Sequence, residues 1–301
     1  MAIKILDLPE QEYMLPGNRA CAGCSLGIAF RHILKALDGN CIFTVPASCL
    51  TVLGGMYPTS SVTVPWMNVV FPSTAAAASG LVAGLKVLGK EHITVVAMAG
   101  DGGTADIGIQ ALSGAAERNA NFLYICYDNE AYMNTGTQRS GSTPMGAKTT
   151  TTPALGKRQH SKDVPKIIEA HGVPYIATAS PSYPADLYDK VRKAIGIHGT
   201  RYMHINAPCP SGWQFPPKDT VKFGRQAIET GIFALYEIQD GVFRLTGRSK
   251  RLAQTGQLTP VRDYIVPQGR FKGIAEETIE EVQRWVNARW AAYVRRDAEA
   301  A

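Results

Sequence analysis

Short runs of apolar residues recur along the chain, and each is followed by Gly, Pro or Asp and then by a helical pattern. Five of these runs predict β-strands, at residues 42–45, 93–98, 122–127, 175–178 and 202–205. Several are almost continuously apolar, as is typical of parallel strands that are covered on both faces. The order of segments therefore predicts an α/β fold: a doubly wound, mostly parallel sheet with helices on both faces.

Helical spacing of apolar residues between these strands predicts helices at 26–37, 74–88, 107–118, 164–171 and 185–195. The polar segment from Ser140 to Gln159 predicts a long loop that is either mobile or functional. After Pro208 the pattern loosens, so residues of about 210–301 are expected to form an irregular extension. It ends in an amphipathic helix at 276–296 that packs on a partner or folds back. Without a repeat or linker, residues 1–301 are expected to form a single domain.

Composition narrows the classes of protein that this chain can be. Of 301 residues, 45% are hydrophobic and 19% charged, which excludes a disordered chain or a coiled coil. The net charge is +6, but the basic residues are scattered, so we expect no nucleic-acid partner. The N-terminus lacks the apolar stretch of a signal peptide, and no uninterrupted apolar run is long enough for a membrane span. We therefore expect a cytoplasmic protein whose six cysteines are metal ligands, reactive thiols or core residues rather than disulfides.

Two motifs follow neighbouring predicted strands. Gly100-Asp101-Gly102-Gly103 comes after the second strand, and Asp128-Asn129-Glu130-Ala131 comes after the third. Open α/β sheets bind ligands at the carboxyl ends of their strands. A carboxylate, an amide oxygen and a backbone carbonyl, from Asp101, Asn129 and the region of Ala131, suit Mg²⁺ on a diphosphate. Either motif alone is typical of an ordinary strand-to-helix turn. The pair, an Asp and an Asn about 28 residues apart, resembles the motif of thiamine diphosphate enzymes, and this resemblance implies thiamine diphosphate with Mg²⁺.

Four cysteines form a second constellation. Cys21 and Cys24 make a C-x-x-C, Cys49 follows a predicted strand, and Cys209 lies between two prolines. Such a set suits zinc, an iron–sulfur cluster or a redox dithiol, because all three need soft sulfur ligands. A thioredoxin-like dithiol is disfavoured because no strand precedes Cys21. Zinc is redox-inert, whereas a cluster beside thiamine can carry away electrons. The remaining cysteines, Cys41 and Cys126, are expected to be buried core thiols.

These motifs in this order closely resemble the thiamine-binding β subunit of 2-oxoacid:ferredoxin oxidoreductases, which include pyruvate and oxalate oxidoreductases. The resemblance covers nearly the whole chain. It rests on residues 17–24, 100–108, 127–136 and 138–144, and on Ala207-Pro208-Cys209-Pro210-Ser211-Gly212-Trp213.

The resemblance implies which residues hold the cofactors. One 4Fe–4S cluster is expected on Cys21, Cys24, Cys49 and Cys209, and Mg²⁺ on Asp101, Asn129 and the carbonyl of Ala131. Further thiamine diphosphate contacts are expected from Cys49, Gly100, Gly102, Gly103, Tyr132 and Asn134. Asn134 falls at the reacting end of thiamine, so it is expected to contact substrate or intermediate as the catalytic residue of this chain.

The resemblance also implies partners, since the Glu that activates thiamine belongs to another subunit in this family. Alpha- and gamma-type subunits are expected to supply that Glu and to complete the substrate site. A delta-type subunit or a separate ferredoxin is expected to accept the electrons. The expected reaction is oxidative decarboxylation of a small 2-oxoacid, with or without coenzyme A, in anaerobic metabolism.

The chain departs from the commonest pyruvate-type pattern at Ser25, Leu50-Thr51 and Phe71-Pro72-Ser73-Thr74. Loss of a carboxylate at Thr51 would ease binding of a more anionic substrate, so oxalate rivals pyruvate. Two other hypotheses stay open. One is a non-redox thiamine-dependent decarboxylase or transketolase-like subunit with structural zinc. The other is a scaffold subunit without cofactor, which the intact Asp101 and Asn129 disfavour.

Overall fold

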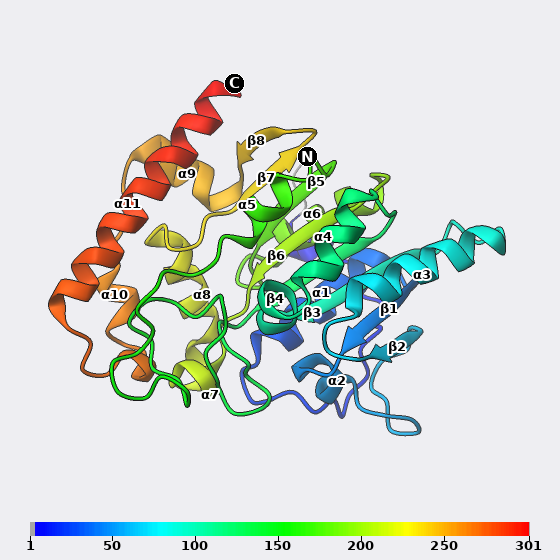
Figure 1. The fold of residues 1–301 in the computed structure, drawn as a ribbon, viewed down its shortest axis with the longest axis horizontal. Helices are drawn as coiled ribbons and strands as arrows, with labels where there is room; N and C mark the ends of the chain where they lie inside the picture. The colour runs from blue at the N-terminus through cyan, green and yellow to red at the C-terminus, as the bar shows by residue number, and fades with distance from the viewer. Residues whose placement is uncertain (1–3, 301) are drawn as a thin grey trace.

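A computed structural model describes residues 4–300, and its centre is an eight-stranded sheet (Figure 1). The strand order is β2-β1-β3-β4-β6-β5-β7-β8. The strands are β1 (Cys41–Pro46), β2 (Trp66–Val69), β3 (Thr94–Gly100), β4 (Leu123–Asp128), β5 (Tyr175–Ala179), β6 (Arg201–Asn206), β7 (Tyr236–Gln239) and β8 (Val242–Leu245). The first six positions in this order are parallel, and β7 and β8 are antiparallel additions. The predicted mostly parallel sheet is confirmed.

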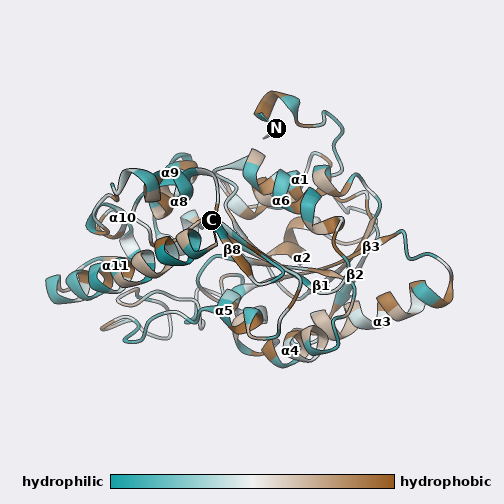
Figure 2. Cartoon of the chain, turned by 90° about the horizontal axis from the view of Figure 1, so that it is seen from above, coloured by the Kyte–Doolittle hydropathy of each residue, from teal (hydrophilic) through white to brown (hydrophobic). Residues whose placement is uncertain are grey.

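Helices cover both faces of the sheet, as Figure 2 shows from above. One face carries α1 (Ser25–Leu37) and α6 (Pro184–Ile195); the other carries α3 (Thr74–Val87), α4 (Ile109–Glu117) and α5 (Val164–Glu169). Alternate strand residues serve the two cores: Val96 and Met98 belong to the first, and Val95 and Ala97 to the second. Period-two alternation in a strand that is buried on both faces explains the continuous apolar runs.

The segment after Pro208 is more regular than predicted. Instead of an irregular stretch it contains α7 (Pro210–Trp213), α8 (Thr220–Glu229), the β7–β8 hairpin, α9 (Gly247–Thr255), α10 (Arg262–Ile265) and α11 (Glu276–Glu299). The hairpin turns at Asp240-Gly241, where both residues have positive φ angles. Asp-Gly between short alternating runs is a strong hairpin signal that our prediction missed, because each strand has only four residues.

The terminal helix α11 folds back over the domain, which decides between the two predicted placements. Its Val282 and Val286 join a third core around Trp213 and Phe223, and its Trp290 joins the second core on the sheet. Within residues 4–300, no helix is both long enough and apolar enough to cross a membrane.

The order in which strands are added to the sheet reverses between β1 and β3. From β1 the chain passes through α2 (Cys49–Gly54) to β2 on one side, and it then returns through α3 to β3 on the other side. Such a switch point leaves a crevice at the carboxyl ends of the two strands, and ligands of open α/β sheets bind there. Two elements that we did not predict, α2 and β2, follow β1 at this point of the fold.

Candidate functional site

The two predicted motifs lie side by side at one edge of the sheet. Asp101 follows the last residue of β3, Asn129 follows the last residue of β4, and the register pairs Gly100 with Tyr127. Because these strands are parallel, their carboxyl ends meet at the same edge. The 27 residues between Asp101 and Asn129 therefore span one crossover, which returns the chain to its starting edge.

The expected Mg²⁺ ligands converge on one point. One polar atom of the Asn129 side-chain amide lies 3.0 Å from the carbonyl oxygen of Ala131 and 3.0 Å from Oδ1 of Asp101. Assigned as nitrogen, that atom donates to both oxygens; assigned as oxygen, it completes a set of three oxygens. Octahedral Mg²⁺ with ligands at 2.0–2.1 Å needs neighbouring oxygens about 2.8–3.0 Å apart. The residues present fit this ion.

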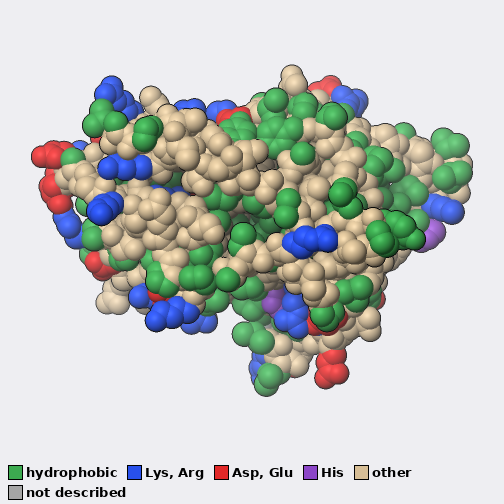
Figure 3. All heavy atoms as spheres, turned by 90° about the horizontal axis from the view of Figure 1, so that it is seen from below, with side chains coloured by type: hydrophobic (Ala, Val, Ile, Leu, Met, Phe, Trp, Pro, Cys, Tyr) green, Lys and Arg blue, Asp and Glu red, His purple; other side chains and the backbone are tan. Residues whose placement is uncertain are grey.

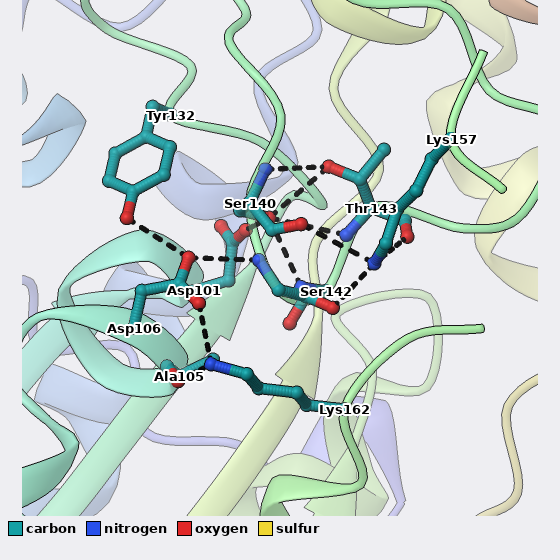
Figure 4. Close-up of polar contacts among 10 residues, drawn as sticks. Asp101, Ala105, Asp106, Tyr132, Ser140, Ser142, Thr143, Lys157 and Lys162 are labelled. Atoms are coloured by element: carbon teal, nitrogen blue, oxygen red, sulfur yellow. Dashed lines mark hydrogen bonds and ion pairs between the residues drawn. The ribbon is translucent and has the colours of Figure 1, made fainter. Parts of the chain in front are cut away.

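Asp101 is completely buried, and its second oxygen is already occupied. The hydroxyl of Ser140 donates to Oδ2, which leaves Oδ1 facing Asn129 (Figure 4). Burial is the main reason that the pKa of Asp101 lies well above its ordinary value, and the nearby Asp128 carboxylate raises that pKa further. A bound cation reverses this effect, because it stabilises the ionised carboxylate.

A loop from the predicted polar segment holds Ser140 in place. The buried Lys157 ammonium donates to the carbonyls of Gly141 at 2.8 Å and Thr143 at 2.6 Å, and Ser140 accepts a longer bond at 3.4 Å (Figure 4). Asp106 accepts a 2.8 Å bond from the Gly141 N–H. These contacts hold the segment in place beside Asp101, which favours the functional alternative of our prediction over the mobile one. We did not predict Lys157, because only tertiary contacts distinguish it from other lysines.

Two glycines permit the close approach of backbone and side chains after β3. A Cβ on Gly102 would lie 2.6 Å from the ring of Tyr132, and a Cβ on Gly108 would lie 2.0 Å from the carbonyl oxygen of Gly103. Between them, Gly102–Asp106 form a short π-helical turn, labelled η2. Such turns occur often at functional sites.

A cavity of about 220 Å³ opens over these residues. Its lining includes all nine predicted thiamine diphosphate contacts: Cys49, Gly100, Asp101, Gly102, Gly103, Asn129, Ala131, Tyr132 and Asn134. It also includes residues that we did not predict: Ala47, Ser48, Phe71, Tyr127, Met133 and Thr135. Ser48 precedes α2 and Phe71 follows β2, so both reach the cavity through elements that we did not predict. The sequence marks Phe71 only as part of a departure from the pyruvate-type pattern.

Cys21, Cys24, Cys49 and Cys209 line a second cavity of about 190 Å³. Cys24 lies just before α1, Cys49 begins α2, and Cys209 lies just before α7, so three separate helix starts bring them together. Cys41 and Cys126 are buried in strands, as predicted. Among residues 4–300, no three His, Cys, Asp or Glu side chains are grouped closely enough to hold a single metal ion.

The two cavities share a wall. Cys49, Asn129, Met133 and Asn134 line both of them. Burial is the main cause that raises the pKa of Cys49 to about 12 and that of Cys209 to about 11, and neighbouring cysteines contribute. These thiols therefore stay protonated near neutral pH unless a metal takes the place of the protons.

His204 is a buried, hydrogen-bonded residue of β6. Its Nε2 lies 2.8 Å from Oδ2 of Asp128, and its Nδ1 lies 2.7 Å from the hydroxyl of Tyr202. Asp128 also accepts a bond from the N–H of Glu130. This buried network fixes the end of β4, from which Asn129 extends.

Comparison with known proteins agrees with this geometry. Residues 48–206 match the family described as thiamine pyrophosphate enzyme, C-terminal TPP binding domain. The chain is 49% identical to pyruvate synthase subunit PorB of Methanothermobacter thermautotrophicus, over 94% of this chain and 98% of that relative. The chain belongs to the β subunits of 2-oxoacid:ferredoxin oxidoreductases.

Other relatives of this β subunit are similar over nearly their full length. Ketoisovalerate oxidoreductase subunit VorB of Pyrococcus abyssi is 43% identical, over 95% of this chain and 93% of that one. A solved 2-oxoglutarate:ferredoxin oxidoreductase from Magnetococcus marinus has a TM-score of 0.57 at 20% identity, over 71% of this chain and 79% of that chain. That likeness concerns the fold alone.

The β subunit therefore binds thiamine diphosphate and works with other subunits. Among the residues that line the two cavities in the described chain, Asp101 is the only carboxylate. It faces the Asn129 amide and the Ala131 carbonyl. A carboxylate for the far end of the cofactor is thus lacking on this side of the crevice.

Proposed function

We propose that this β subunit holds thiamine diphosphate through Mg²⁺ bound by Asp101, Asn129 and the Ala131 carbonyl. The convergence of a carboxylate, an amide and a carbonyl at 3.0 Å spacing carries this proposal. When bound, thiamine diphosphate supplies the electron sink for decarboxylation of a 2-oxoacid. The chain's part is to bind and orient it: Asp101 and Asn129 fix the ion, and the backbone of Gly102 and Gly103 lines the cavity beside Asp101.

The second cavity is the proposed site of one 4Fe–4S cluster, with Cys21, Cys24, Cys49 and Cys209 as ligands. Its common wall with the thiamine cavity supports this choice, because electrons would then pass between adjoining sites. Structural zinc is the competing occupant. It would keep the four thiolates but could carry no electrons, and it would leave a non-redox thiamine enzyme.

Asn134 is the proposed polar contact to substrate. It is exposed and lines both cavities, so its amide can reach a molecule that lies between the two cofactors. A neutral amide donates and accepts hydrogen bonds without adding charge. We assign it to orientation of the substrate rather than to proton transfer.

The missing carboxylate is proposed to come from an alpha- or gamma-type subunit that covers the crevice. Seen from below, the molecule has a hollow that hydrophobic side chains border (Figure 3). Between α2 and α3, Met56 is 73% exposed, Tyr57 94% and Val70 71%. Exposed apolar groups gathered near an incomplete site are typical of a protein interface. A ferredoxin, as a separate protein or a delta-type subunit, would then accept the electrons.

The proposed substrate is a small 2-oxoacid, and pyruvate comes first because a 49% identical relative is a pyruvate synthase subunit. The case for oxalate rested on Thr51. The Thr51 hydroxyl donates to the Pro46 carbonyl at 2.8 Å, and Thr51 is not part of the lining of either cavity. The structure thus offers no direct contact through which Thr51 would favour a more anionic substrate.

Cofactor analysis of the anaerobically purified complex tests this proposal. In Asp101→Ala, thiamine and Mg²⁺ content should collapse, whereas Asp263→Ala, at an exposed aspartate on α10, should retain both. In Cys49→Ser, about four irons and their acid-labile sulfides should be lost. Retained thiamine in Asp101→Ala would refute the Mg²⁺ site, and zinc in place of iron would refute the electron-transfer function.

A further inference from the structure

One charged residue contributes to the lining of the cysteine cavity. Eighteen residues line this cavity, and among them Arg19 alone carries a formal charge near neutral pH. The rest of the lining is apolar or neutral: it includes Leu26, Leu53 and Met133. Arg19 also lies two residues before Cys21, in the segment that carries the first two cysteines.

The structure holds the Arg19 guanidinium in a defined place. The backbone N–H of Arg19 donates to the carbonyl of Leu53 at 3.3 Å, and its Nη2 donates to Oγ1 of Thr59 at 2.7 Å. Between these anchors the side chain crosses Gly55, where a Cβ would lie 1.9 Å from Nη1. A side chain at residue 55 would displace the guanidinium from this place, and the φ of +70° at this residue favours glycine as well.

The hydrogen bond to Thr59 does not neutralise the positive charge of Arg19. Thr59 is neutral, and its own hydroxyl donates to the Met56 carbonyl, so its lone pairs are free to accept the guanidinium N–H. A group bound by four thiolates is anionic, and one-electron reduction adds another negative charge. A fixed cation beside it stabilises the reduced form more than the oxidised form.

We propose that Arg19 raises the reduction potential of the iron–sulfur cluster that Cys21, Cys24, Cys49 and Cys209 hold. The inference rests on the proposed function, since it requires the cluster. Arg19 acts on the cluster electrostatically, without ligating it. Thr59 and Gly55 determine where the guanidinium lies. Because the side chain is exposed, salt should weaken the effect.

An EPR-monitored redox titration of the anaerobically purified complex tests this inference, with the signal assigned by its loss in Cys49→Ser. Arg19→Gln should shift the oxidised-to-reduced ratio at a fixed poise about tenfold toward the oxidised form, or 59 mV for one electron. Arg19→Lys keeps the charge and should shift less. Lys86→Gln removes an exposed cation on α3, away from the cavity lining, and should leave the potential unchanged.

A potential unchanged in Arg19→Gln, at full iron content, would overturn the inference. If that variant raises the KM for the 2-oxoacid while the potential stays fixed, Arg19 is a substrate contact instead, and the inference also fails. If Arg19→Gln loses iron, Thr59→Val replaces it: this change frees the guanidinium, and an unshifted potential there overturns the inference. Absence of iron from the wild type would be a failure of the proposed function, not of the role of Arg19.

Discussion

Replacing Lys157 with Met tests whether the loop beneath Asp101 depends on one buried ammonium group. Lys157 is 3% exposed, and its Nζ donates to the carbonyls of Gly141 and Thr143. That loop places the Ser140 hydroxyl on Asp101. Methionine fills a similar volume but donates no hydrogen bond, so it leaves the carbonyls unpaired. We expect lower stability and weaker thiamine binding together.

The magnitude follows from the two short bonds. A hydrogen bond to a charged group contributes about 1.5–3 kcal/mol, so losing two costs about 3–6 kcal/mol. Proteins are stable by about 5–15 kcal/mol in total, so this is a large fraction. For a chain of this size, roughly 2 °C of Tm per kcal/mol gives a fall of roughly 6–12 °C.

Thermal unfolding of the purified complex, with and without added thiamine diphosphate and Mg²⁺, measures the effect. The matched control is Lys166→Met on α5, where the lysine is exposed, and its Tm should change by no more than about 1 °C. A Lys157→Met protein with wild-type Tm would show that the carbonyls find other donors. If it lost stability but kept full thiamine content, the loop would not support Asp101.

Three further results are expected. Burial lowers the pKa of Lys157 to about 8, so between pH 8 and about 10.4 the unfolded chain binds more protons than the folded chain. The free energy of unfolding of the wild type should therefore rise with pH in this range, and its difference from that of Lys157→Met in urea unfolding should widen. A difference that narrows would contradict this. Gly108→Ala should cost about 2 kcal/mol or more and reduce thiamine content, because its Cβ meets the Gly103 carbonyl. Gly196→Ala should do neither, because a Cβ there makes only an ordinary 3.5 Å contact with the Lys193 carbonyl. Because burial holds the pKa of Cys49 at about 12, iron uptake during anaerobic reconstitution should increase from pH 7 to pH 9, and a flat profile would argue against thiolate ligation.

The sequence by itself determined the parts of this protein that depend on local pattern. The five predicted strands became β1, β3, β4, β5 and β6, because continuous apolar runs suit strands buried on both faces. Asp101 and Asn129 could be placed at one edge, because each follows a parallel strand. The cysteine motif and the resemblance to a family named the expected cofactor residues without any coordinates.

Tertiary structure decided what depends on distant contacts. Lys157 looks like an ordinary lysine in the sequence, and only folding brings it to the loop beside Asp101. Arg19 and Phe71 belong to segments that stand out in the sequence, but only folding shows that they line the two cavities. The strands β2, β7 and β8 have four residues each, which is too short for periodicity to identify them. Hydrogen bonds and cavity walls join residues that lie far apart along the chain. A sequence pattern depends only on residues that are close together in the sequence. The sequence therefore indicated the chemistry of the site. The fold decided which residues hold the loop beside Asp101, which residues line the two cavities, and that Arg19 is among them.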